Sequence, residues 1–236
     1  MTAVTVLDRL WERVSGSQPL PPAWVIGATA LAALIIVTSN SSWQVAGKVI
    51  TIAHEGGHAL VSLLSGRRLE GIRLHADSSG VTYSRGRRHG PGLVATSAAG
   101  YLAPPLLGAG AAVLLAAGHE TAMLWLALVL LAATLLAIRN AFGVVAVLVT
   151  AGAVFAVSDF TSAAVQAGFA YLAAWFLLFG GLRPVLELLR RRRYRTGVTD
   201  ADQLGQLTAV SSGVWTALFL LVSVAALAVG ARLLVP

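Results

Sequence analysis

Residues Trp43 to Leu64 read WQVAGKVITIAHEGGHALVSLL, an apolar run interrupted in its second half by His54, Glu55 and His58. A helix of about 20 mostly apolar residues is long enough to cross the hydrocarbon core of a membrane. Ionisable side chains are costly at that depth and usually face a cavity or one another. The run therefore predicts a helix in the membrane that carries a functional site.

His54 and His58 are four residues apart, so on a helix both imidazoles project from the same face and can bind one metal ion. Together with Glu55 they form the pattern His-Glu-x-x-His. On a helix this pattern is the signature of zinc proteases, in which the histidines hold the ion and the glutamate acts as general base. We therefore expect Zn²⁺ as cofactor, His54 and His58 as ligands and Glu55 as the catalytic residue. The alternative is a chance match, with histidines that hydrogen-bond neighbouring helices.

The composition indicates an integral membrane protein. Hydrophobic residues make up 57% of the 236 residues, charged residues make up 11%, and the mean hydropathy is +0.78. A soluble domain of this size could not bury so much apolar surface. The net charge of +7 suits an excess of arginine in cytoplasmic loops, and we expect no nucleic-acid partner. The chain has no cysteine, so its metal ligands must be nitrogen and oxygen atoms.

Seven apolar stretches reach or approach the length of a membrane span. The sequence thus predicts an all-α multi-span membrane protein with about seven transmembrane helices and a small cytoplasmic β-hairpin after the second. The cores of the seven stretches are Trp24 to Thr38, Trp43 to Leu64, Leu93 to Ala117, Ala122 to Ile138, Phe142 to Val157, Ala163 to Leu182 and Leu207 to Val235.

The distribution of basic residues predicts the orientation. If the N-terminus is cytoplasmic and the chain crosses seven times, all but Lys48 and Arg232 of the 17 lysines and arginines lie on the inner side. This agrees with the positive-inside rule. We therefore expect a cytoplasmic N-terminal segment, residues 1–22, and a polytopic membrane domain, residues 23–236.

The segment after the second stretch reads as a hairpin over about residues 67–85, because two strand-like runs flank the turn residues Asp77 to Gly80. With HEGGH at residues 54–58, the Gly100 to Pro105 interruption and the Thr199 to Asp202 segment, the chain resembles the site-two protease family of intramembrane zinc metalloproteases. The likeness is to a divergent bacterial branch and covers most of the chain from about Trp43 onward.

This resemblance implies a zinc metalloendopeptidase in the bacterial plasma membrane. It implies a membrane-anchored protein as substrate and the lipid bilayer as surroundings. Family members usually take their third zinc ligand from an aspartate in an Asn-Pro-x-Asp-Gly or Leu-Asp-Gly element on a later span. The nearest element here, Asn140-Ala141-Phe142-Gly143, has no aspartate.

Three residues are candidates for the third ligand. Asn140 could donate its carbonyl oxygen, although a neutral amide is a poorer zinc ligand than a carboxylate and Asn140 could equally begin a helix. Asp200 and Asp202 precede the last span on the same side as the histidines, and either could approach the ion. Their alternative role is to cap a helix together with Thr199.

If zinc is bound, the expected reaction is hydrolysis of a peptide bond by a metal-activated water. Glu55 would take the proton of that water and pass it to the leaving amine. Lipid excludes water, so the site needs a polar path from the cytoplasm. The substrate must be extended where it is cut, and an edge of the hairpin could pair with it as an added strand.

The alternative function is a non-proteolytic membrane scaffold or metal-binding relative that has lost the third zinc ligand. The missing aspartate after Asn140 favours this alternative. The presence of Glu55 favours hydrolysis, because a structural zinc site needs no general base beside it. A transporter is disfavoured, since charged residues are not scattered along several spans as an ion pathway would require.

Overall fold

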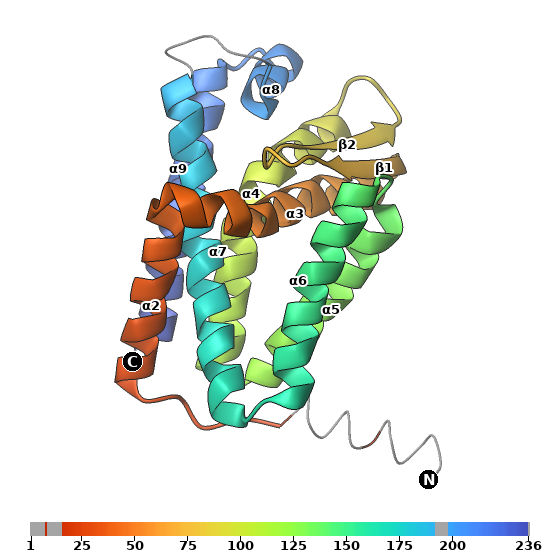
Figure 1. Cartoon of the computed structure of the whole chain (residues 1–236). Coiled ribbons are helices and arrows are strands. Elements are labelled where there is room, and N and C mark those ends of the chain that lie inside the picture. The colour runs from red at the N-terminus through yellow and green to blue at the C-terminus, as the bar shows by residue number, and fades with distance from the viewer. Residues whose placement is uncertain (1–7, 9–15, 192–197, 236) are drawn as a thin grey trace.

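The computed structural model describes residue 8, residues 16–191 and residues 198–235, and this part is helical except for one hairpin (Figure 1). In chain order the elements are α2 (Ala23–Thr38), α3 (Asn40–Leu64), β1 (Arg68–Leu74), β2 (Gly80–Arg85), α4 (Pro91–Ala116), α5 (Glu120–Ala137), α6 (Ala141–Phe160), α7 (Ala163–Arg191), α8 (Asp200–Thr208) and α9 (Ser212–Leu234).

Within the described residues, five helices are long and apolar enough to cross a membrane: α4, α5, α6, α7 and α9. Helices α2 and α3 qualify only as a pair bent by 101°, which raises the number to six if the pair is one span. The prediction of a helical, multi-span membrane protein with a hairpin after the second helix is confirmed. The span count is five or six rather than about seven.

The difference arises at Ser39, where the chain turns sharply between α2 and α3. Ser39 is extended, and its side chain accepts a hydrogen bond from the backbone N–H of Ser42, so it caps α3 as a new helix. Arg183 of α7 ties both sides of the corner together by donating to the backbone oxygen of Val37 and, at 2.8 Å, to Oδ1 of Asn40. Helix α2 therefore runs along the bundle, whereas α3 lies across its upper end (Figure 1).

The described part of the N-terminal segment, residues 16–22, lies far from the hairpin (Figure 1). The backbone N–H of Gln18 donates to the carbonyl of Gly118 at 2.7 Å, and its side chain donates to Thr121 at the same distance. Residues 16–22 thus lie at the end of the bundle opposite the hairpin, whereas the expected topology puts residues 1–22 on the same side as the hairpin. Arg9 and Arg13, counted there with the inner side, lie outside the described residues.

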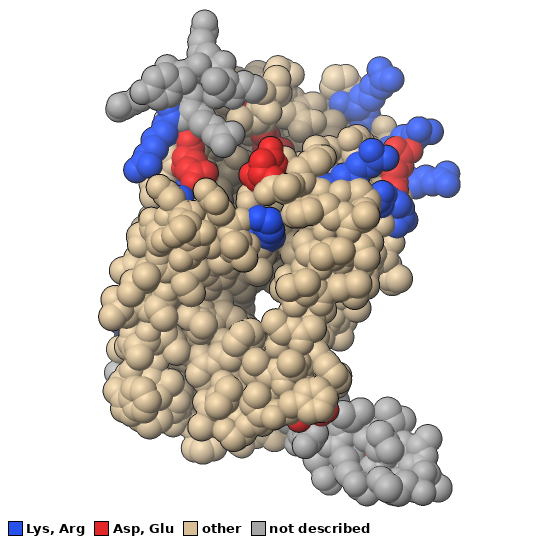
Figure 2. All heavy atoms as spheres, in the orientation of Figure 1, with Lys and Arg blue, Asp and Glu red and all other residues tan. Residues whose placement is uncertain are grey.

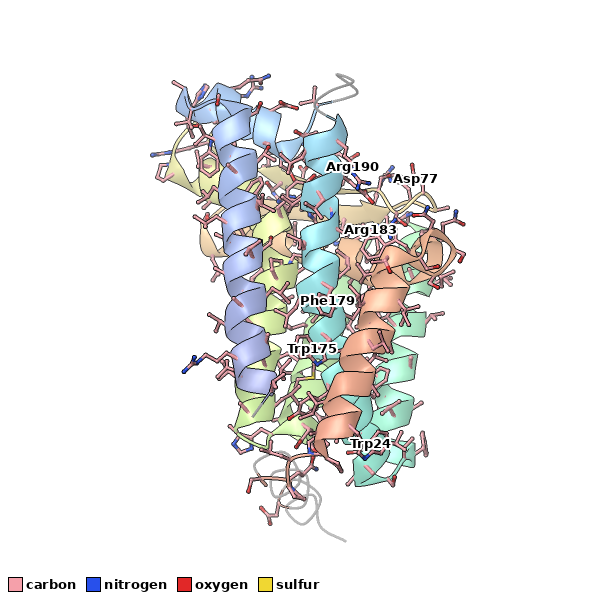
Figure 3. All side chains as sticks on the ribbon, turned by 90° about the vertical axis from the view of Figure 1, so that its left-hand side faces the viewer. Trp24, Asp77, Trp175, Phe179, Arg183 and Arg190 are labelled. Atoms are coloured by element: carbon pink, nitrogen blue, oxygen red, sulfur yellow. The ribbon has the colours of Figure 1, made fainter. Side chains whose placement is uncertain are left out.

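Charged side chains distinguish one end of the molecule from the other (Figure 2). Lys and Arg side chains gather at the upper end of the molecule, around the hairpin (Figure 2). Arg183 and Arg190 lie toward the same end as Asp77, whereas Trp24 lies at the opposite end of α2 (Figure 3). Lys48, expected near the outer face, is part of α3 at the basic end. Between the ends the visible surface carries almost no charge, as a lipid-facing surface requires (Figure 2).

The hairpin is fixed to the rest of the molecule through the outer edge of β1. The backbone N–H of Arg139 donates to the carbonyl of Ile72 at 2.8 Å, and Ile138 forms a parallel bridge with Ile72. Gly71 has a φ of +151° and lies so close to Arg139 that a Cβ would overlap its side chain. Since Ile138 to Asn140 cover this edge, β2 presents the other edge of the hairpin.

Helix α3 packs tightly on α4, and this contact positions the ionisable residues of α3. A Cβ on Gly57 would overlap that of Ala103 and lie 2.9 Å from the carbonyl oxygen of Ala99. The absence of a side chain lets the two backbones approach closely, as in membrane helix pairs generally. Helix α4 continues through Pro104 and Pro105, although a sequence with two prolines suggests an interruption there.

Candidate metal centre

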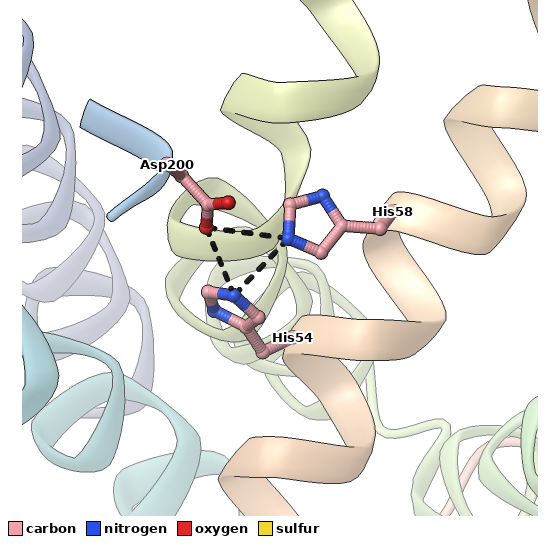
Figure 4. A group of neighbouring side chains, drawn as sticks. All are labelled: His54, His58 and Asp200. Atoms are coloured by element: carbon pink, nitrogen blue, oxygen red, sulfur yellow. Dashed lines mark hydrogen bonds and ion pairs between the residues drawn. The ribbon is translucent and has the colours of Figure 1, made fainter. Parts of the chain in front are cut away.

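His54 and His58 lie one turn apart on α3, and their rings face the same space. Their Nε2 atoms are 3.1 Å apart, and the ring planes are nearly perpendicular with centroids 4.8 Å apart (Figure 4). This is the arrangement that the spacing of four residues predicts for a helix.

Asp200, the first residue of α8, completes a cluster with the two histidines. Its Oδ2 atom lies 3.2 Å from Nε2 of His54 and 3.3 Å from Nε2 of His58 (Figure 4). One ligand atom from each of the three residues lies within 4.8 Å of the others. Among the described residues, this is the one group of three or more His, Asp or Glu side chains so arranged.

The local structure of α8 explains why Asp200 rather than Asp202 faces the histidines. Thr199 is the N-cap, its hydroxyl oxygen accepts from the backbone N–H of Asp202, and the carboxylate of Asp202 accepts from the backbone N–H of Thr199 at 3.1 Å. This reciprocal capping box holds Asp202 against the start of the helix. Asp200 is left to project from the first turn toward α3.

The side chain of Asn140 forms hydrogen bonds with the backbone of β1. Its side-chain oxygen accepts from the N–H of Leu74 at 3.1 Å, and its side-chain nitrogen donates to the carbonyl of Leu74 at 2.7 Å. Both polar atoms of the Asn140 amide are thus engaged with the backbone of β1. Asp202 is not part of the group that His54, His58 and Asp200 form.

Two neighbours from α4 hold the histidine rings. Nδ1 of His58 lies 2.6 Å from the carbonyl oxygen of Thr96, so Nδ1 carries the proton and donates it. With Nδ1 engaged in this way, Nε2 is the ring nitrogen of His58 that faces the cluster. The ring of Tyr101 meets His54 edge to face with centroids 4.9 Å apart and is itself stacked on Phe219 of α9.

Gly100 of α4 makes the space into which both imidazoles point. A Cβ at this position would lie 2.5 Å from Nε2 of His54 and closer still to Nε2 of His58. In the sequence, Gly100 stands out only as part of an interruption in a span. No residue pattern would have identified it, because the contact joins α3 to α4 through tertiary packing.

The cluster is an electrostatic match for a divalent cation. Burial would raise the pKa of the Asp200 carboxyl, but hydrogen bonds with His54 and His58 outweigh burial and hold that pKa well below its ordinary value. A carboxylate oxygen and two imidazole Nε2 atoms therefore converge on one point, and such a donor set suits a divalent cation. Ligand atoms about 2.0 to 2.1 Å from a tetrahedral zinc ion are about 3.4 Å apart. The separations of 3.1 to 3.3 Å are close to that value.

Glu55 is buried, with 4% of its surface exposed, and is held by the hairpin. Its Oε2 atom accepts a hydrogen bond of 2.6 Å from the hydroxyl of Thr82 in β2. Gly80 packs against the same carboxylate, since a Cβ there would lie 2.7 Å from Oε1. The sequence predicts a hairpin near the site, but it does not predict that Thr82 and Gly80 contact the expected general base.

A cavity of about 440 Å³ leads to this cluster from the basic end of the molecule. It lies between β2, the start of α4 and the start of α8, and both His58 and Asp200 line it. Thr82, Thr96 and Ser97 add hydroxyl groups to its walls. The cavity is a polar path of the kind that hydrolysis within a membrane requires.

Comparison with known proteins identifies a family. The sequence model of the family described as Peptidase M50B-like matches residues 27–230, which is most of the chain. No curated protein and no solved structure matches the chain. The matched residues include α3 with His54, Glu55 and His58, and also α8 with Asp200.

Proposed function

The chain belongs to the Peptidase M50B-like family, in agreement with its resemblance to site-two proteases, and from this premise we propose that it is an intramembrane zinc metalloendopeptidase. Its reaction is hydrolysis of a peptide bond in a membrane-anchored protein. The observation that carries this proposal is the convergence of His54, His58 and Asp200 on one point, next to Glu55 on the same helix.

The ligands of the metal in this proposal are Nε2 of His54, Nε2 of His58 and a carboxylate oxygen of Asp200. Two nitrogen ligands and one oxygen ligand form a common catalytic zinc set, in which a fourth position stays open for water or substrate. The space that Gly100 leaves beside both Nε2 atoms suits an ion better than a side chain. When bound, zinc would polarise the scissile carbonyl and lower the pKa of water.

The chain's own residues supply the proton transfers. Glu55 accepts the proton of the attacking water and delivers it to the amine that leaves. The hydroxyl of Thr82 fixes one oxygen of Glu55, and the missing side chain of Gly80 keeps space beside the other. Thr96 holds the ring of His58 through Nδ1, so that Nε2 remains available as a ligand.

The proposed orientation places the hairpin end in the cytoplasm of a bacterial cell. The basic residues of the hairpin, of the α5–α6 connection and of the end of α7 all lie at that end, and the positive-inside rule assigns such an end to the cytoplasm. The described start of the chain, residues 16–22, then lies on the outer side of the plasma membrane.

The substrate in this proposal enters the cavity as an extended segment. A helical peptide hides its carbonyl groups in its own hydrogen bonds, so the segment must unwind before cleavage. The outer edge of β1 is covered by Ile138 to Asn140, whereas β2 lines the cavity. Pairing of the substrate with β2 as an added strand would satisfy its backbone next to Glu55.

The structure weakens the case for a non-proteolytic scaffold. The missing aspartate after Asn140 favours that alternative, because it leaves the third metal ligand unassigned by the family pattern. Asp200 supplies an oxygen at 3.2 to 3.3 Å from both histidines, and Glu55 is present on the same helix. These residues support hydrolysis over a purely structural role.

Zinc content and hydrolysis together test the proposal. Purified wild type should contain about one zinc ion per chain, whereas His58→Ala and Asp200→Asn should lose it because each removes a ligand. Asp202→Asn is the matched control and should keep its zinc, since an amide oxygen can still accept from Thr199. Zinc retained in all four proteins would contradict the proposed ligand set.

Glu55→Gln separates an enzyme from a scaffold. It should keep its zinc but cleave fluorescein-labelled casein in detergent at least about a hundredfold more slowly than wild type, because it removes the general base. Equal cleavage by wild type and Glu55→Gln, or no zinc-dependent cleavage by either, would contradict the protease function.

A further inference from the structure

Arginine side chains line the wall of the cavity that leads to the candidate metal centre. Arg67 follows α3, Arg85 ends β2, and Arg88 precedes α4, and all three belong to the cavity lining. The one acidic residue in that lining is Asp200, whose carboxylate is already engaged by His54 and His58. The outer part of the cavity is therefore basic.

Arg67 is held in place rather than loose in solvent. Its Nε donates to the hydroxyl of Ser84 at 3.1 Å, and Nη1 donates to the carbonyl of Arg87 at 2.7 Å. A Cβ on Gly86 would lie 3.2 Å from Nη1, so the chain leaves just enough room for the guanidinium. A guanidinium fixed in this way is well suited to pair with a carboxylate.

Arg85 and Arg88 add positive charge with which an incoming anionic group can pair. Arg85 pairs with Glu70 at 2.8 Å, but its side chain is 80% exposed, so this ion pair is weak and can exchange partners. Arg88 is exposed. An anionic segment in the cavity would thus meet three positive charges before it reaches His58.

We propose that this arginine-lined groove, formed by Arg67, Arg85 and Arg88, selects substrates with acidic residues on the cytoplasmic side of the cleaved bond. The inference rests on the proposed function, because it names the class of substrate that the same site takes. The occupant is a peptide segment with glutamate or aspartate side chains, which complement the charge of the groove.

The distance along α3 indicates where the acidic residues lie. Leu64, at the end of the helix, is six positions after His58, which corresponds to about 9 Å along the helix axis. An extended peptide advances about 3.3 Å per residue. Arg67, shortly after the helix end, would meet a side chain roughly three to five residues from the cleaved bond.

Peptide binding tests the groove without relying on hydrolysis. The protein is Glu55→Gln in nanodiscs of zwitterionic lipid, and the probes are two fluorescein-labelled peptides of equal length, one of alternating Glu and Ser and one of alternating Gln and Ser. Fluorescence anisotropy at low salt should show that the Glu peptide binds at least about tenfold more tightly, and salt of about 1 M should remove most of the difference.

Variants of the groove assign the preference to particular residues. Arg67→Gln and Arg88→Gln should each weaken binding of the Glu peptide by about three- to tenfold and leave the Gln peptide unchanged. Arg88→Gln is informative even if Arg67→Gln disturbs the hairpin. The matched control is Arg73→Gln on β1, which removes the same charge from the hairpin outside the cavity lining and should have no effect.

Three outcomes would overturn the inference. They are equal binding of the Glu and Gln peptides, a loss in Arg73→Gln as large as in Arg88→Gln, and disappearance of the preference in nanodiscs with anionic lipid, which would show that the arginines face headgroups. Peptide binding requires neither zinc nor cleavage. The zinc or casein experiments could therefore fail while the Glu peptide still binds more tightly than the Gln peptide. That result would contradict the proposed function but not the binding of acidic peptides by the groove.

Discussion

Gly100 shows how strongly one residue without a side chain controls the candidate metal centre. Its Cα faces the space between His54 and His58, and a Cβ would overlap both Nε2 atoms. Cores and sites that are packed this closely cannot absorb even one added methyl group without movement of their neighbours. The Nε2 atoms of His54 and His58 can approach each other only because the facing residue of α4 is a glycine.

Gly100→Ala should therefore abolish metal binding while α4 remains intact. The added methyl group would push both imidazoles apart, and we expect zinc content measured by mass spectrometry to fall at least about tenfold. Gly110→Ala on the same helix is the matched control, because no atom lies within 4 Å of a Cβ at that position. Equal zinc content in the two variants would show that Gly100 does not shape the site.

At the scale of elements, the hairpin and α8 each bring one functional group to α3. The hairpin brings Thr82 to Glu55, and α8 brings Asp200 to the histidines. Different contacts hold the two elements. Hydrogen bonds from Asn140 hold the hairpin, and the capping box of Thr199 holds the start of α8. Asp200 and the hydroxyl that contacts Glu55 thus reach α3 from separate elements.

Asn140→Ala distinguishes a hairpin anchor from a metal ligand. The variant loses both hydrogen bonds to Leu74, which together contribute about 1 to 3 kcal/mol to holding the hairpin. We expect unchanged zinc content, slower casein cleavage and faster amide hydrogen exchange in residues 68–85. Loss of zinc in this variant with unchanged hydrogen exchange would instead favour Asn140 as a ligand.

At the scale of the whole molecule, the corner at Ser39 decides which parts of the chain share a side. Helix α3 lies across the upper end of the bundle with the hairpin beside it, while residues 16–22 lie at the far end (Figure 1). The arrangement puts the candidate metal centre near the basic end, where the cavity opens toward Arg67, Arg85 and Arg88. The candidate metal centre is thus open to solvent from that end.

Single cysteines test this arrangement, because the natural chain has none. Ser17→Cys and Ala76→Cys both change exposed residues, one in the N-terminal segment and one in the hairpin turn. A membrane-impermeant maleimide should label Ser17→Cys in intact bacterial cells and label Ala76→Cys only after the inner membrane is permeabilised. Labelling of both only after permeabilisation would support the seven-span arrangement instead.

The sequence by itself determined the membrane class of the protein, the hairpin after HEGGH and the pairing of His54 with His58. These features depend on composition and on the local period of a helix or a turn, which neighbouring residues set. Only the tertiary structure decided that Asp200 rather than Asp202 or Asn140 joins the histidines, that Thr82 holds Glu55, and that α2 and α3 meet at a corner. These outcomes depend on contacts between residues far apart in the chain, and local sequence patterns carry no information about such contacts.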